Sequence, residues 1–227
     1  MPDGIASMPV PPLLCAFSST LFTSFSQSLS CLIPTLTIVF CVAGVAQAKT
    51  WTTSASGLQN SINKARDGDI IRVTGSSTKS QILVKKRLTI EGKGNHTLSG
   101  MMTVRASGAV VRNLTFRNVS YGSRSASISV RGAHKVRVEH NDIAGSRGMG
   151  IFVARSNDVE VTDNKIRSVR CMKGSSGYTT AQGVKVGQGS KRIVVMNNTV
   201  EGLQGCRTTA AFSVIRAARM ACSKEIG

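Results

Sequence analysis

The sequence contains few acidic and few aromatic residues. Its 227 residues include 11 acids against 29 lysines and arginines, for a net charge of +18, and the aromatics are seven Phe, two Tyr and one Trp. Such a charge favours an anionic partner, whether acidic polysaccharide, nucleic acid or anionic lipid, and indicates nothing about the fold. Surfaces that bind single-stranded nucleic acid interleave aromatic residues with basic ones, and the shortage of aromatics argues against such a partner.

A long hydrophobic segment is also absent. The main apolar run, residues 32–45, is shorter than the roughly 20 residues that a membrane-spanning helix needs, so we expect no stable membrane span. The run ends in Ala46-Gln47-Ala48, a small-x-small sequence typical of a signal-peptidase site. We interpret residues 1–48 as a signal peptide or targeting segment and predict a secreted, extracellular protein. These residues lack the usual opening lysines and arginines, so a transit peptide, a retained anchor and a wrongly chosen start codon are the alternatives.

Metal-binding motifs are missing as well. The six cysteines include no Cys-x-x-Cys pair and the histidines no helical pair, so the sequence indicates no zinc site. Four sequons would accept N-linked glycans in a host that glycosylates proteins. These sequons begin at Asn95, Asn113, Asn118 and Asn197.

The sequence does contain an internal repeat. Residues 136–143 (VRVEHNDI), 159–166 (VEVTDNKI) and 193–200 (IVVMNNTV) share the pattern V-x-V-x-x-N-x-I. A looser copy, residues 109–116, has Leu114 in place of the Asn. A second alternating apolar triplet accompanies the copies, at residues 82–84, 102–104, 128–130, 151–153 and 184–186.

Alternation with a period of two predicts short strands with one buried face. The first strands recur 21, 27, 23 and 34 residues apart, from Ile90 through Val111, Val138 and Val161 to Val195. A period of roughly 20 to 30 residues is typical of a solenoid. Each strand then pairs with its equivalents in adjacent turns, about 4.8 Å away. We predict an all-β fold, a single parallel β-helix of about six rungs.

The repeat sets the expected organisation of the chain. Residues 49–69 form an N-terminal segment with a short capping helix, because Leu58, Ile62 and Ala65 share one helical face. The β-helix spans residues 70–205. The repeat fades afterwards, so we expect residues 206–227 to be an irregular tail. The alternatives are one more second-strand triplet at residues 212–214, a covering helix, or a truncated end.

Stacking turns equivalent positions into columns. Asn141, Asn164 and Asn198 form an asparagine ladder at the bend after the first strand, where an amide bonds its copy and tolerates a left-handed backbone. A second polar column holds His140, Asp163 and Asn197. The same register places acids over bases, and we interpret these pairs as solvated ion pairs. The pairs are Arg112 with Glu139, Arg137 with Glu160, and Asp142 with Lys165.

A further column consists of basic residues that follow the second strands. We call it the basic stripe, and its members are Lys85, Arg105, Arg131 and Arg155. Like charges stacked at strand spacing repel one another. One interpretation is that these side chains splay into water, and the other is that they bind an extended polyanion.

The longest insertion in the repeat, residues 167–183, precedes the last second-strand triplet. Insertions in repeat proteins gather on the binding face, and this one contains Tyr178, which can stack on a sugar; a surface loop without a role is the alternative. Cys171 and Cys206 follow equivalent repeat positions by five and six residues. We predict that they form a disulfide, because equivalent backbones one rung apart lie within bridging distance.

These residues resemble the pectate-lyase-like superfamily of right-handed parallel β-helices. The resemblance covers about residues 56–204, and residues 109–118 (AVVRNLTFRN) are similar to a phrase characteristic of the third rung of that superfamily. It implies a single-stranded right-handed parallel β-helix. The scaffold carries lyases, hydrolases, epimerases, adhesins and binding modules, so it fixes no activity.

A polysaccharide lyase of this kind needs a base and a cation, with Ca²⁺ one choice, to neutralise the uronate carboxylate. Lys185 is the candidate catalytic base, and Glu160 and Asp163 are the candidate metal ligands. However, residues 181–190 (AQGVKVGQGS) lack the Glu of the alginate and chondroitin lyase branch and hold the Lys out of register. Two hypotheses follow. The first is a secreted monomer that associates with an acidic polysaccharide and cleaves or modifies it. The second is a non-catalytic polyanion- or carbohydrate-binding surface protein, or a truncated paralogue.

Overall fold

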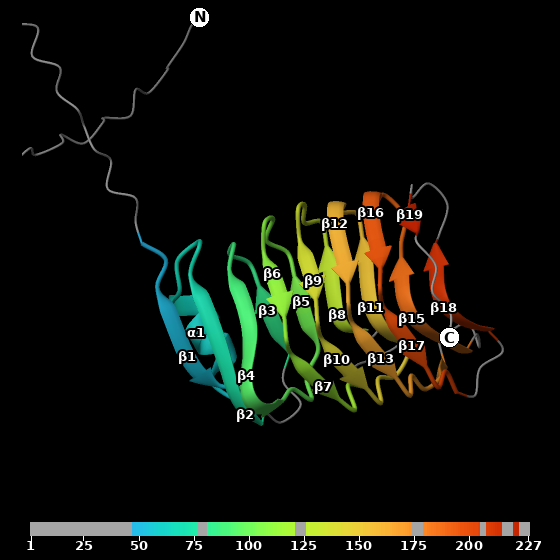
Figure 1. Ribbon diagram of the computed structural model, residues 1–227, viewed down its shortest axis with the longest axis horizontal. Coiled ribbons are helices and arrows are strands. Elements are labelled where there is room, and N and C mark those ends of the chain that lie inside the picture. Colours follow the sequence, from blue (N-terminus) through green and yellow to red (C-terminus); the bar gives the residue numbers. More distant parts are fainter. Residues whose placement is uncertain are drawn as a thin grey trace, which may run out of the picture. The chain divides into compact units, whose positions relative to one another are not determined.

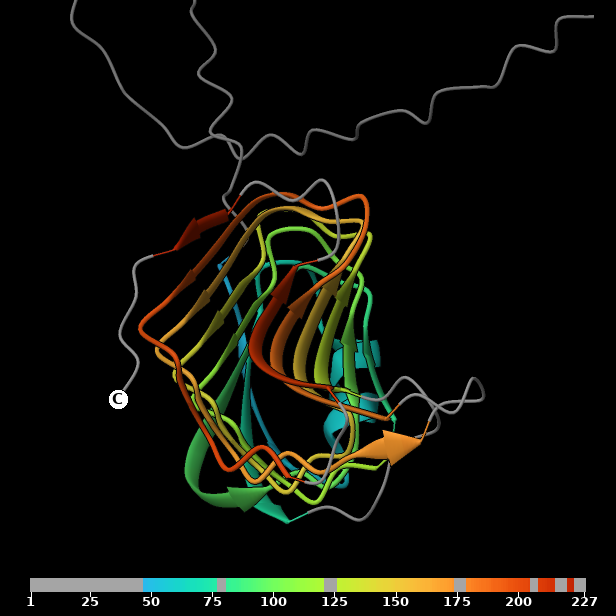
Figure 2. The ribbon, with the colours of Figure 1, turned by 90° about the vertical axis from the view of Figure 1, so that its right-hand side faces the viewer.

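The computed structural model describes residues 47–76, 81–120, 126–173, 179–204, 208–214 and 220–222. In this part of the chain, three parallel sheets wind into a right-handed β-helix of about five turns, slightly fewer than the six expected. Figure 1 shows the rungs stacked in chain order from the N-terminal to the C-terminal end. Figure 2, which looks along the stack, shows the strands of successive turns lying over one another on the sides of the coil.

The turns from residue 110 onward run from sheet A to sheet C and then to sheet B, whereas the described strands of the earlier turns belong to sheets A and B alone. Sheet A contains β1 (Thr50–Ser54), β2 (Ile70–Ser76), β4 (Thr89–Thr97), β6 (Val110–Arg112), β9 (Arg137–Glu139), β12 (Asn157–Thr162), β16 (Lys191–Met196) and β19 (Met220–Cys222). Sheet C contains β7 (Thr115–Arg117), β10 (Asp142–Ala144), β13 (Lys165–Arg167) and β17 (Thr199–Glu201). Sheet B contains β3 (Ile82–Val84), β5 (Met102–Val104), β8 (Ala126–Arg131), β11 (Met149–Ala154), β15 (Thr179–Val186) and β18 (Thr208–Val214), and the short β14 (Met172–Lys173) pairs antiparallel with β15.

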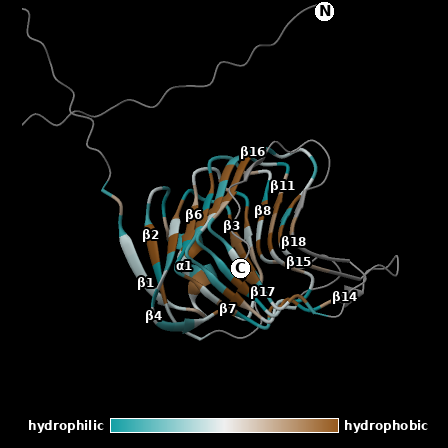
Figure 3. Ribbon diagram, turned by 45° about the vertical axis from the view of Figure 1, so that its right-hand side comes forward, coloured by the Kyte–Doolittle hydropathy of each residue, from teal (hydrophilic) through white to brown (hydrophobic). Residues whose placement is uncertain are grey.

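The predicted register is confirmed in sheets A and B. Val111 pairs with Val138, Val138 with Val161, and Val161 with Val195. The first three of these valines are fully buried, and the inward side chains form the apolar interior seen as brown strands in Figure 3. The third sheet is an addition to the prediction, which assigned two strands to each turn.

The asparagine ladder is confirmed, and the left-handed backbone lies one residue before it. Asn141 Nδ2 donates to Asn164 Oδ1, and Asn164 Nδ2 donates to Asn198 Oδ1, both at 2.9 Å. The residues with positive φ at this bend are Asn113, His140, Asp163 and Asn197, with φ between 53° and 55°. We call these four residues the left-handed column. At this bend, therefore, one residue adopts the left-handed backbone and the next residue supplies the ladder side chain.

Helix α1 (Leu58–Lys64) forms as predicted, with Leu58, Ile62 and the following Ala65 buried. Lys86 holds its C-terminal end, because Nζ donates to the carbonyl oxygens of Asn63 at 2.7 Å and Ala65 at 2.6 Å. A cation there complements the partial negative charge of the helix terminus.

Both ends of the β-helix differ from expectation. Sheet A begins earlier, because β1 pairs with β2 before the first predicted strand. At the other end, β18 and β19 continue sheets B and A within the segment expected to be irregular, and Phe212 pairs with Val184. The alternative of one more second-strand triplet at residues 212–214 is thus correct.

The outward acids are stacked as predicted, but they form ion pairs with residues other than the predicted ones. Arg112 lies in register between Glu91 and Glu139, and its guanidinium bonds Glu91 at 2.7 Å rather than Glu139. Arg137 approaches Glu139 of its own strand at 3.8 Å rather than Glu160. Asp142 lies beside Lys165 in register but bonds two arginines instead. Long guanidinium side chains reach along and across strands, so register alone does not fix the pairs.

Candidate functional site

The basic stripe lies at the corner where the chain leaves sheet B for sheet A. The amide of Arg105 donates to the carbonyl oxygen of Val84 at 2.8 Å, which sets Arg105 beside Lys85 on adjacent rungs. Arg131 ends β8 and pairs with Ala154, and Arg155 is the next residue. Four successive rungs thus carry a cation at one corner, about 4.8 Å from rung to rung.

One member of the stripe is held in place and the others extend into solvent. The guanidinium of Arg131 lies 4.8 Å from the centre of the Phe152 ring, and its Nε donates to Ser129 Oγ at 2.8 Å. Lys85, Arg105 and Arg155 are exposed, and none forms an ion pair with an acid of the described residues. The stripe therefore includes three exposed cations that the described acids leave unneutralised.

The acids that do form ion pairs lie on sheets A and C. Glu91 receives hydrogen bonds from Arg72 and Arg112, and the bond from Arg72 is the main reason that its pKa lies below the ordinary value. Burial raises the pKa of Asp142, but hydrogen bonds from Arg117 and Arg167 outweigh burial and keep the pKa low. The described strands of sheet B contain no acidic residue at all.

The three residues predicted for catalysis and metal binding lie on different sheets. Lys185 points outward from β15 on sheet B, between the inward Val184 and Val186, and pairs with Phe152 of the preceding rung. Glu160 points outward from β12 on sheet A, and Asp163 is in the bend between sheets A and C. No group of three potential metal-ligating acids, histidines or cysteines occurs among the described residues. The structure thus brings no acid from this set to Lys185.

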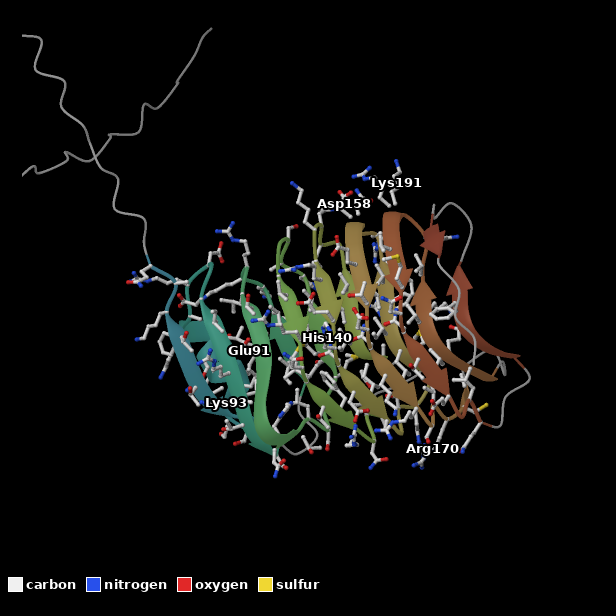
Figure 4. All side chains as sticks on the ribbon, in the orientation of Figure 1. Glu91, Lys93, His140, Asp158, Arg170 and Lys191 are labelled. Carbon is white, nitrogen blue, oxygen red and sulfur yellow. The ribbon has the colours of Figure 1, made fainter. Side chains whose placement is uncertain are left out.

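A cavity of about 300 Å³ lies at the opposite edge of sheet B, where the chain arrives from sheet C. It is lined by Asn118, Ser120, Gly145, Arg147 and Arg170. Arg147 and Arg170 are paired in register on adjacent rungs, and Arg170 Nη2 donates to Asn118 Oδ1 at 3.4 Å. In Figure 4, Arg170 lies at one edge of the coil, whereas Asp158 and Lys191 lie at the opposite edge. We call this cavity the corner pocket.

A family model described as a right-handed β-helix region matches residues 47–214. This match covers more than half of the chain and all of its described strands except β19. The chain belongs to the right-handed β-helix family. None of the curated proteins compared with the sequence matches it.

In the long insertion of this β-helix protein, β14 pairs antiparallel with β15, with Met172 opposite Thr180 and Lys173 opposite Thr179. Tyr178, the predicted stacking residue, lies outside the described residues. So does Cys206, and the predicted disulfide therefore stays a prediction. The backbone register agrees with it: Ile166 pairs with Val200, and the amide of Cys171 donates to the carbonyl oxygen of Gln204 at 3.2 Å.

The four predicted glycosylation sites of this β-helix protein are all exposed. Asn95 lies in β4, Asn113 and Asn197 belong to the left-handed column, and Asn118 lines the corner pocket. No described helix is long and apolar enough to cross a membrane.

Two features of this surface were missed in the sequence. Phe152 had a signal, because it is an aromatic residue at the outward position of an apolar triplet. The corner pocket had no signal in the sequence. It is lined by residues from loops of different length, and which of these loops lie next to one another follows only from the stacking of the rungs.

Proposed function

We propose that this β-helix protein is secreted and binds an extended acidic polysaccharide along sheet B, without cleaving it. Assignment to the pectate-lyase-like superfamily, with its many carbohydrate-active members, is part of the proposal. The observation that carries it is the exposed, unneutralised set of Lys85, Arg105 and Arg155 on the rungs of one corner. A polymer with one negative charge per sugar presents charges in a row, and the stripe presents cations in a row.

Sheet B offers cations along both edges. The basic stripe borders the end of its strands, and Arg147 and Arg170 of the corner pocket border their start. Lys185 stands between these edges beside Phe152. Because the described strands of sheet B lack acids, a polyanion lying across them meets attraction without competing negative charge.

The placement of the sequons supports the proposed route to the outside of the cell. All four asparagines are exposed in the folded chain, so glycans attached there would not disturb the apolar interior. We propose that Asn95, Asn113 and Asn197 carry glycans in a host that glycosylates proteins. A glycan at Asn118 would occupy the corner pocket.

The experiment compares two double variants with equal loss of charge. Arg105→Ser with Arg155→Ser removes two cations of the stripe. Lys93→Ser with Lys165→Ser removes two exposed cations of β4 and β13, on sheets A and C. Retention on immobilised polygalacturonate, alginate and heparin is measured against salt concentration. The stripe variant should elute at lower salt and show a shallower salt dependence, by about two ionic contacts, whereas the control should stay close to wild type. Equal shifts in the two variants would reduce the effect to net charge and overturn the proposal.

The alternative is that the protein cleaves the polysaccharide that it binds. Lys185 is the candidate base, and a lyase reaction would leave an unsaturated uronate that absorbs ultraviolet light. We expect no increase in absorbance with pectate, alginate or glycosaminoglycans, with or without Ca²⁺. An increase that Lys185→Met abolishes, while retention on the column is kept, would establish a lyase in place of a binding protein.

A further inference from the structure

The carboxylate of Asp69 is buried without a cationic partner in hydrogen-bond contact. Asp69 precedes β2 and is 5% exposed. Its oxygens accept hydrogen bonds from the amide of Arg66, the indole Nε1 of Trp51 and the amide of Lys49, each at 2.9 Å. Within the described residues it forms no ion pair. The hydrogen bond from Arg66, followed by those from Trp51 and Lys49, holds the pKa of Asp69 below its ordinary value, so this carboxylate is charged among neutral donors.

One of those donors occupies a special place in the sequence. Lys49 follows directly after Ala48, the last residue of the small-x-small sequence. The carbonyl oxygen of Lys49 accepts the amide of Ile70 at 2.9 Å, and its Nζ lies 4.2 Å from the centre of the Trp51 ring. The backbone nitrogen of Lys49 is therefore fixed 2.9 Å from Asp69 Oδ1. Gln47 and Ala48, by contrast, are exposed and lie outside any strand or helix.

We propose that a peptidase specific for small residues cleaves the peptide bond between Ala48 and Lys49, and that the new α-ammonium group of Lys49 forms an ion pair with Asp69. In this hydrolysis the C–N bond breaks, water supplies the hydroxyl of the new Ala48 carboxyl group, and the amine of Lys49 takes up a proton. The nitrogen needs no displacement, because it is already within hydrogen-bond distance of Oδ1. The inference rests on the proposed secretion of the chain and is independent of the proposed polysaccharide binding.

The positive charge that cleavage creates on Lys49 changes its hydrogen bond with Asp69. A neutral amide donor becomes an ammonium donor, and hydrogen bonds between two ionised groups are shorter and stronger than those with a neutral donor. Asp69 favours the protonated amine, so the folded-state pKa of the α-amino group rises above its ordinary value of about 7.7 to 8.0. This stabilisation is fully present below the unfolded pKa and is lost as the pH rises through the folded pKa.

The test expresses the full-length chain in a secreting host and examines the secreted protein. Intact mass and N-terminal peptide mapping should give Lys49 as the first residue. The purified protein is then acylated at neutral pH, and labelling of the α-amine is followed by peptide mapping. Only the unprotonated amine reacts, so a pKa raised by one unit slows labelling about tenfold. The Asp69→Asn variant should therefore label several-fold faster than wild type.

Asp67→Asn serves as the matched control, because Asp67 is exposed, two residues away, and accepts the amide of Arg87 at 3.0 Å rather than that of Lys49. Its labelling rate should equal that of wild type. Trp51, the single tryptophan of the chain, gives a second readout, since its fluorescence should titrate with the α-amine above pH 8 in wild type and not in Asp69→Asn.

The possible failures are distinguishable. A secreted chain that begins elsewhere would overturn the cleavage site. A chain that begins at Lys49 but labels equally fast in wild type and in Asp69→Asn would retain the cleavage and overturn the ion pair. Where Asp69→Asn is not secreted, wild type in urea replaces it: the α-amine must label several-fold faster unfolded than folded, and equal rates would overturn the ion pair.

Discussion

Truncation of Asn164 to alanine is expected to destabilise the β-helix strongly. Asn164 is 1% exposed and is the middle residue of the asparagine ladder. Its Oδ1 accepts hydrogen bonds from both the amide and Nδ2 of Asn141, and its Nδ2 donates to the carbonyl oxygens of Val138 and Thr162 and to Asn198 Oδ1. The side chain thus makes five hydrogen bonds across three rungs.

The expected cost follows from the groups left behind. Asn141 Nδ2 keeps the carbonyl oxygen of Val111, and Asn198 Oδ1 keeps the amide of residue 164. The buried amide of Asn141 loses its acceptor, and such a loss costs about 1 to 3 kcal/mol. With the weaker losses added, we expect Asn164→Ala to lower the free energy of unfolding by about 3 to 4 kcal/mol.

Urea unfolding followed by far-ultraviolet circular dichroism measures this change as a shift of the midpoint at constant slope. Lys165→Ala, an exposed neighbour, is the control and should change stability by less than about 0.5 kcal/mol. Asn198→Ala should cost less than Asn164→Ala, because Asn198 is 8% exposed. A cost below about 1 kcal/mol for Asn164→Ala, the net value of a single hydrogen bond, would refute the ladder as a source of stability.

Four further predictions concern other parts of the fold. Gly92→Ala should destabilise the protein, because a Cβ there would overlap a backbone carbonyl of the next rung and the His96 ring; a thermal melt unchanged from wild type would contradict this. His140→Val should cost about 1 to 2 kcal/mol and His140→Asn much less, since a β-branched residue resists positive φ, as urea midpoints will show. Because the pKa of Glu91 is lowered, its ion pairs stabilise the fold above the unfolded pKa of about 4.3, and this stabilisation is lost as the pH falls through the folded pKa. Between pH 6 and pH 3, the melting temperature of Glu91→Gln should therefore fall less than that of wild type. Parallel curves for the two proteins would contradict the linkage. Non-reducing peptide mapping of secreted protein should find Cys171 joined to Cys206, and free thiols at both positions would disprove the pairing.

The inward face of this fold was predictable because it repeats. Val111, Val138 and Val161 follow one period-two pattern, and a parallel stack permits one register for them, so pairing followed directly. The ends lacked that redundancy. β1 shows no copy of the pattern and is held by pairing with β2, while Phe212 begins a triplet too isolated to be distinguished from a helix.

The outward face was predictable only in part. The repeat shows which side chains are adjacent on neighbouring rungs, but Arg112 lies in register beside both Glu91 and Glu139, and the repeat does not show that it bonds Glu91. The left-handed position was wrong by one residue for a different reason. The residues of the left-handed column are all Asn, Asp or His, the side-chain types most enriched at positive φ. The adjacent ladder position holds Asn141, Asn164 and Asn198, which are equally suited to positive φ, so residue type alone does not distinguish the two positions.

The basic stripe differs in kind from the other outward columns. On sheets A and C, an acid such as Glu91 or Asp142 lies between two arginines and forms an ion pair with each, which offsets the repulsion between the arginines. At the corner after sheet B the same stacking repeats cations, three of them without an ion pair to any described acid, and like charges at this spacing repel. Arg131 contributes contacts with Phe152 and Ser129, but Lys85, Arg105 and Arg155 contribute no ion pair with a described acid. A bound polyanion would supply the missing negative charge in the same linear arrangement, and for this reason we propose a binding role for these three cations rather than a stabilising one.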